Sequence, residues 1–144
     1  MKILRLILAG TAFAIIGQAI HVIEAFATMQ YYMLPEYWPV WSKIMMPGPG
    51  PPGTEFYAAS IVFGIVTGTL AAFVYGKVKP ALPGKNALNR GFYYGLMLFM
   101  VAGLPTTFTM FLLFNVPAGL VAAWTASGLA VHMLGSAAIA KIMG

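Results

Sequence analysis

The stretch LILAGTAFAIIGQAIHVI, at residues 6–23, decides the fold because it is long, apolar and free of acidic and basic residues other than one histidine. A helix needs about 20 predominantly apolar residues to cross a hydrocarbon core about 30 Å thick, and the apolar character continues here to about residue 32. A membrane-spanning β-barrel would instead alternate weakly in segments of about 10 residues. Three further stretches have the same character, so we predict four transmembrane helices, at about residues 4–33, 55–76, 91–115 and 117–142.

The composition of the chain points to lipid as its solvent. Of the 144 residues, 60% are hydrophobic and only 8% are charged, whereas about a quarter of the residues in a soluble domain are charged. A chain of this length is expected to form one domain. The prediction is therefore an all-α membrane protein, a single four-transmembrane-helix bundle over residues 1–144. The absence of cysteine excludes thiol catalysis, thiolate metal sites and disulfides.

The positions of the cations predict the orientation in the membrane. Cytoplasmic loops carry an excess of Lys and Arg, and four crossings place every cation except Lys43 on one side. We therefore predict a multi-pass protein of the inner (cytoplasmic) membrane, with both termini in the cytoplasm. The net charge of +5 is explained by these residues lying beside anionic headgroups, so we expect no nucleic-acid partner. The residues on that side are Lys2, Arg5, Lys77, Lys79, Lys85, Arg90 and Lys141.

The N-terminal segment also has features of a secretory signal peptide. Lys2 and Arg5 precede an apolar stretch, and Ala19 ends a small-x-Ala pattern of the kind that is cleaved. The apolar run continues beyond Ala19, however, so we expect the first helix to remain uncleaved.

The loop after the first predicted helix, MLPEYWPVWSKIMMPGPGPPGTE, is rich in proline and tryptophan. Trp38 and Trp41 stand at helical spacing with Met45, which predicts a short helix in the headgroup layer with the two tryptophans as interfacial anchors. The run PGPGPPG cannot continue a helix, and Thr54 is predicted to cap the next one. A lid or a partner-docking surface is the alternative function for this loop.

Each predicted helix has one face of small or polar residues. In lipid, helices associate through such faces, and ionisable side chains turn inward because hydrocarbon penalises them. We therefore expect these faces to meet inside the bundle, with a kink at Pro105 in the third helix. The clearest seam repeats at steps of three and four residues along the first helix: Gly10, Ala14, Gly17, His21, Glu24 and Thr28.

Two members of that seam, His21 and Glu24, are neighbours on one helical face because they are three residues apart. A hydrogen bond between them would satisfy the carboxylate and fix helix packing as a structural clamp. The alternative is a ligand or ion site that opens to the outer side, with Gln18 and Thr28 nearby. A single intramembrane acid makes a proton-driven pump a poor fit, because a pump needs more than one titrating relay group.

His132, in the fourth predicted helix, raises the question of a shared metal or haem site with His21. The two helices run in opposite directions, and a rise of 1.5 Å per residue places the two histidines about 10 Å apart along the membrane normal. Zinc ligands must lie about 2 Å from one ion. We therefore predict no metal and no haem cofactor, although His132 stays among the candidate site residues.

Several short motifs together resemble a known group of proteins. The first helix with His21 is followed by a loop with Trp38, Trp41 and KIMM, by GFYYG at the start of the third helix, by NVPAGLVAAW and by a closing GSAAIAKI. The chain resembles small four-helix integral membrane proteins of bacteria and archaea with no assigned function. This resemblance implies the four-helix topology and carries over no catalytic residue.

These observations leave three classes of function. No phosphate-binding loop, nucleophile elbow or HExxH pattern is present in the sequence, so we expect a non-enzymatic protein without catalytic residues. It would act by helix association, either as a homo-oligomer or as an accessory subunit of a larger membrane complex. The alternatives are a small carrier, channel or ligand-binding protein with a site at His21 and Glu24, and a cofactor-binding redox subunit.

Overall fold

The computed structural model describes residues 2–48 and 50–144, and this part of the chain is helical with no strand. Four helical stretches are long and apolar enough to cross a membrane, which confirms the predicted all-α membrane fold and indicates a multi-pass membrane protein. The α-helices are α1 (Ile3–Tyr32), α2 (Thr54–Val78), α3 (Ala87–Leu98), α4 (Leu104–Leu113) and α5 (Ala118–Met143). Short 3₁₀ segments are η1 (Pro35–Val40) and η2 (Lys79–Ala81), and a π-helical segment, η3 (Phe99–Gly103), joins α3 to α4.

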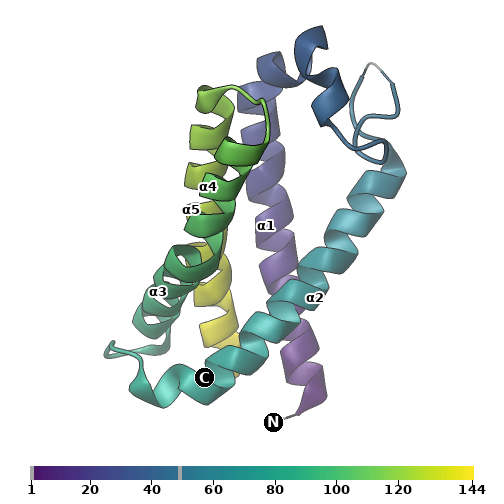
Figure 1. Cartoon of the computed structure of the whole chain (residues 1–144). Helices are drawn as coiled ribbons and strands as arrows, with labels where there is room; N and C mark the ends of the chain where they lie inside the picture. Colours follow the sequence, from purple (N-terminus) through teal and green to yellow (C-terminus); the bar gives the residue numbers. More distant parts are fainter. Residues whose placement is uncertain (1, 49) are drawn as a thin grey trace.

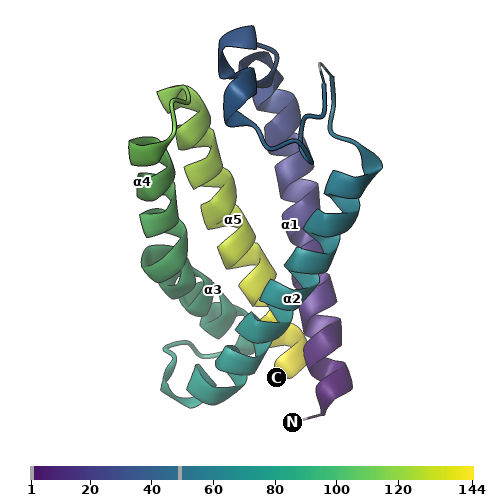
Figure 2. The same cartoon turned by 45° about the vertical axis from the view of Figure 1, so that its right-hand side comes forward.

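The helices pack in the order α2, α1, α5, α3, and α2 also touches α5. Both termini lie at one end of the bundle (Figures 1 and 2), which we call the terminal end. The proline- and tryptophan-rich loop lies at the opposite end, the loop end. α2 crosses α1 near the terminal end and then diverges from the other helices toward the loop end (Figure 1). The bundle is therefore closed at the terminal end and spread at the loop end.

Small residues allow the closest helix contacts, as the seam of the first helix predicts. A Cβ at Gly68 of α2 would lie 2.7 Å from the carbonyl oxygen of Gly10, and one at Gly64 would lie 3.1 Å from the Cβ of Ala14. On the other side of the bundle, a Cβ at Gly95 would lie 2.7 Å from the Cα of Met133. Close backbone approach replaces the hydrophobic effect, which does not drive association between helices in lipid.

The core is concentrated toward the terminal end. Tyr75 of α2 is fully buried and packs edge-on against Tyr94 of α3, with ring centroids 5.4 Å apart. The Tyr94 hydroxyl donates a hydrogen bond of 2.7 Å to the carbonyl of Ala71. Toward the loop end, burial falls away in two helices: no residue of α4 is buried, and the buried residues of α2 begin at Gly68. Thr28 of α1 and Leu120 of α5 remain buried there.

Two local signals shift the third helix from its predicted form. It begins at Ala87, before the expected start at residue 91, because the side chain of Asn86 caps it by accepting a hydrogen bond of 2.8 Å from the Asn89 amide. Pro105, where we expected a kink, is the second residue of α4, which begins where the π-helical segment η3 ends. Proline lacks the N–H that would complete the preceding turn, and single π-turns are a common way for a helix to absorb such a break.

The loop between α1 and α2 differs in detail from its predicted short helix. The 3₁₀ segment η1 contains Pro39 and ends at Val40, so Trp41 has an extended backbone and lies outside the helix. At the start of α2, Gly53 is the N-cap and Thr54 is the first helical residue, with no side-chain capping bond. The expectation that Thr54 caps this helix is therefore wrong. Glu55 does lie in the first turn, where the helix dipole favours an acid.

Candidate functional site

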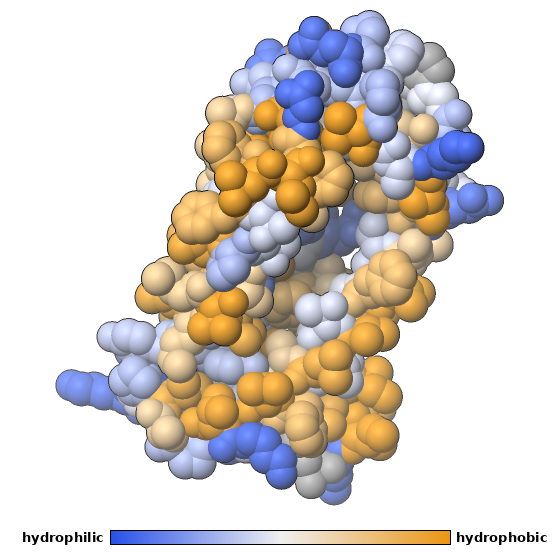
Figure 3. Space-filling view, in the orientation of Figure 1, coloured by the Kyte–Doolittle hydropathy of each residue, from blue (hydrophilic) through white to orange (hydrophobic). Residues whose placement is uncertain are grey.

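The spreading of the helices leaves an opening on one side of the molecule. Figure 3 shows a hollow below the loop, between α2 and the neighbouring helices, with hydrophilic surface visible inside it. We call this opening the lateral groove. The glycines that bring α2 close to α1 are Gly68, opposite Gly10, and Gly64, opposite Ala14.

The seam of α1 has packed positions on either side of an open part. Gly10, Ala14, Gly17 and Thr28 are buried, whereas His21 is exposed and Glu24 is half-buried between them. The small residues and Thr28 are therefore packed as expected, and His21 is more exposed than a fully packed seam predicts.

Glu24 has a different partner from the one predicted. Thr28 as a residue is only 6% exposed. Its hydroxyl oxygen lies 2.7 Å from Glu24 Oε1 and 2.8 Å from the Glu24 main-chain oxygen. Within the described residues, no hydrogen bond joins His21 to Glu24. The His–Glu clamp is thus replaced by a Thr–Glu contact one helical turn along. Gln18 is half-buried in the turn before His21.

His132 lies deeper in the bundle than His21. Its Nδ1 is 2.7 Å from the carbonyl oxygen of Gly128 and donates to it, while its ring lies edge-on to Phe13 of α1 and Phe99 of η3 at 6.5 and 5.9 Å. A Cβ at Gly103 would lie 3.3 Å from the ring. The π-helical segment therefore forms one wall of the His132 environment.

The structure does not bring His21, Glu24 and His132 together as one site. Val131, the neighbour of His132, packs opposite Gly17. His21 lies one turn beyond that level, about 6 Å along α1. No group of three or more His, Asp or Glu side chains in the described part of the chain has the spacing to hold a metal ion.

An aromatic cluster at the loop end was not predicted. Trp124 of α5 donates a hydrogen bond of 2.9 Å from Nε1 to the Tyr32 hydroxyl. Trp41 packs on both rings, with centroids 5.1 Å from Tyr32 and 6.2 Å from Trp124. Trp41 is thus turned toward the bundle, while Trp38 remains exposed. An apolar cavity of about 180 Å³ lies beside the cluster, lined by Val40, Trp41, Met110, Phe114, Val116 and Trp124.

The arrangement offers hydrogen-bonding groups at membrane depth but no assembled catalytic set. Glu24 and His21 can accept or donate protons or hydrogen bonds to something that enters the lateral groove. Comparison of the chain with protein-family models, with curated proteins and with solved structures found no match. The function proposed below therefore rests on the geometry of the groove.

Proposed function

We propose that this protein is a non-enzymatic membrane protein that acts by helix association, as a homo-oligomer or as an accessory subunit of a larger membrane complex. The single observation that carries the proposal is the exposed His21 on the open part of the α1 seam. No hydrogen bond joins it to another residue in the described ranges. An imidazole facing hydrocarbon is unfavourable by several kcal/mol, so a partner that covers the groove would stabilise it.

The geometry of the groove fits a helix better than it fits more lipid. Its α1 side carries a polar residue beyond the small residues that already pack α2, and polar side chains strengthen association between helices in lipid. On the α2 side, no residue from Thr54 to Phe63 is fully buried. A partner helix lying there would pack against α1 beyond the point where α2 crosses it.

The absence of cysteine makes a direct crosslinking test possible, because single-cysteine variants have no background. His21→Cys faces the groove, whereas Ile23→Cys is also exposed but lies about 200° away around the helix. We expect oxidation in native membranes to crosslink His21→Cys to a second copy or to another subunit, and the size of the product tells which. Equal crosslinking of the two variants, or none with His21→Cys, would contradict association through the groove.

A second function, a small carrier, channel or ligand-binding protein, is favoured by one specific observation. The Glu24 side chain is half-buried and contacts the Thr28 hydroxyl, and the molecule has an opening in which hydrophilic surface is visible (Figure 3). A water-filled groove of this kind would present the carboxylate to a cation or a polar solute.

The same His21→Cys variant distinguishes the two functions. If the groove holds water and solute, a membrane-impermeant thiol reagent added from the loop side labels His21→Cys rapidly, and Ile23→Cys stays unlabelled in lipid. If a partner helix fills the groove, the reagent labels neither variant until the partner is removed. Protection of His21→Cys with no crosslinked product and no co-purifying protein would contradict both proposals.

A further inference from the structure

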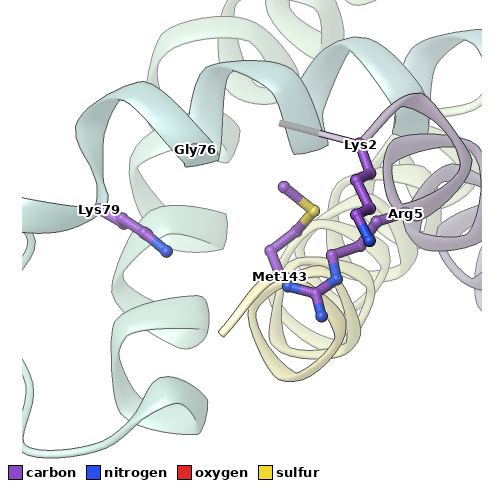
Figure 4. A pocket seen from close by; sticks show the side chains of 5 residues that line it. All are labelled: Lys2, Arg5, Gly76, Lys79 and Met143. Carbon is purple, nitrogen blue, oxygen red and sulfur yellow. The ribbon is translucent and has the colours of Figure 1, made fainter.

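A second hollow lies at the terminal end, away from the lateral groove. It has a volume of about 290 Å³ and is lined by Lys2, Arg5, Gly76, Lys79 and Met143. Figure 4 shows that the cations come from two walls: Lys2 and Arg5 extend from the start of α1, and Lys79 extends from the end of α2 on the opposite side. Met143, near the end of α5, lies between them. We call this hollow the basic pocket.

Within the described residues, no acidic side chain lines the basic pocket. The three acids of the sequence lie away from it: Glu24 in the last third of α1, Glu36 in η1 and Glu55 in the first turn of α2. The ammonium group of Lys79 donates a hydrogen bond of 2.8 Å to the main-chain oxygen of Gly144, which fixes its position. Three cations that converge on one cavity repel one another unless an anion joins them.

The depth of the basic pocket identifies the source of that anion. The apolar span of α1 begins directly after Arg5, and the exposed side chains beside the pocket on α1 are apolar, with Ile3 73% and Leu4 66% exposed. The pocket thus lies at the level where hydrocarbon gives way to headgroups. Exposed Phe73 and Val74 continue the apolar surface along α2 toward the membrane centre.

We propose that the basic pocket binds the phosphate of an anionic phospholipid headgroup, with the acyl chains lying along the apolar surfaces of α1 and α2. The Arg5 guanidinium can hold two phosphate oxygens at once, and lysine ammonium groups add point charges on the other oxygens. Basic pockets between helices at a membrane surface are a known kind of site for anionic headgroups. The pocket would recognise the phosphate group, and a lipid of the surrounding membrane would supply it.

The test measures lipids retained by the full-length protein. Protein reconstituted in bilayer discs of phosphatidylcholine and phosphatidylglycerol is analysed by native mass spectrometry, and the ratio of the two retained lipids is compared between variants. One cation near an anionic headgroup contributes about a fivefold change in binding. Arg5→Gln is therefore expected to lower retention of phosphatidylglycerol about fivefold, and the triple variant Lys2→Gln, Arg5→Gln, Lys79→Gln to remove the preference altogether.

The matched control removes the same charge from the same end of the molecule. Lys77, Lys85 and Lys141 are exposed and do not line the pocket, so their triple change to Gln is expected to preserve the preference. Equal loss in both triple variants would overturn the proposal, because it would show general attraction to a basic surface. Wild-type protein that retains the two lipids equally would overturn it as well.

Two further arms address the source of the phosphate and the integrity of the fold. Millimolar inorganic phosphate is expected not to displace phosphatidylglycerol; displacement would assign the pocket to free phosphate instead. Helical content is checked by circular dichroism. Should the pocket triple lose its fold, the comparison of Arg5→Gln with Lys85→Gln decides, and equal lipid retention by these two single variants counts against the site.

Discussion

At the scale of single residues, the α1 seam shows how a polar group is satisfied inside a membrane helix. Thr28 contacts both a side-chain and a main-chain oxygen of Glu24, so its hydroxyl is never without an acceptor. His132 uses the same device through the Gly128 carbonyl. His21 lacks such a local bond in the described structure, and this difference is why the proposed function is tested at His21.

The Thr28–Glu24 contact predicts a small effect on stability. Changing Thr28 to Val removes the hydroxyl of a buried residue whose hydrogen bond lies within α1, and a typical intramolecular hydrogen bond contributes about 1 kcal/mol. We expect Thr28→Val to lower the free energy of unfolding by about 1 kcal/mol, and Thr28→Ser to keep the bond and lose less. Denaturation in mixed micelles followed by circular dichroism measures both. A larger loss for Ser than for Val would show that the methyl group matters and the hydroxyl does not.

At the scale of elements, the glycines of α3 set the distance to α5. A Cβ at Gly95 would collide with the backbone of Met133, lying 2.7 Å from its Cα, so the two helices are held closer than any other residue would allow. Gly128 of α5 also lies within a helix, but the nearest atom to its Cβ position is 3.8 Å away on Phe99, which is ordinary contact. The packing therefore requires glycine at position 95 but not at position 128.

This difference yields a matched pair of substitutions. Gly95→Ala must push α3 from α5, and overpacking of this kind destabilises by about 1–3 kcal/mol. Gly128→Ala makes only an ordinary contact with Phe99 and removes a poor helix former, so we expect it to be neutral or to stabilise by up to about 1 kcal/mol. Thermal unfolding in detergent, monitored by circular dichroism, gives both values. Tolerance of Gly95→Ala equal to that of Gly128→Ala would contradict the close packing of α3 on α5.

At the scale of the whole molecule, the spans were predictable and their spreading was not. Length and apolar character alone place α1, α2 and α5 within a few residues, because lipid imposes those limits. The seam on α1 identifies Gly10 and Ala14 as packing residues. It does not give the crossing angle of α2, the exposure of His21 or the π-helical segment before Pro105. Trp124 was missed because its partners, Tyr32 and Trp41, are distant in sequence.

The predicted orientation, with both termini in the cytoplasm, rests on the distribution of the cations and can be tested on the intact cell. Ser42 lies in the exposed loop at one end, and Lys85 is exposed at the other. With the termini in the cytoplasm, a membrane-impermeant thiol reagent labels Ser42→Cys in whole cells, whereas Lys85→Cys reacts only after permeabilisation. The reverse pattern would place the termini outside and contradict the positive-inside expectation.

The concentration of tight packing toward the terminal end has a mechanical consequence. If the loop end is pulled by a tether while the termini are held in the bilayer, the outer turns of α2 have few buried contacts to resist the load. These turns should therefore yield first and at low force. Resistance should then rise abruptly at Gly68, Ala71 and Tyr75, so that a force–extension trace would show an early soft step followed by one cooperative rupture.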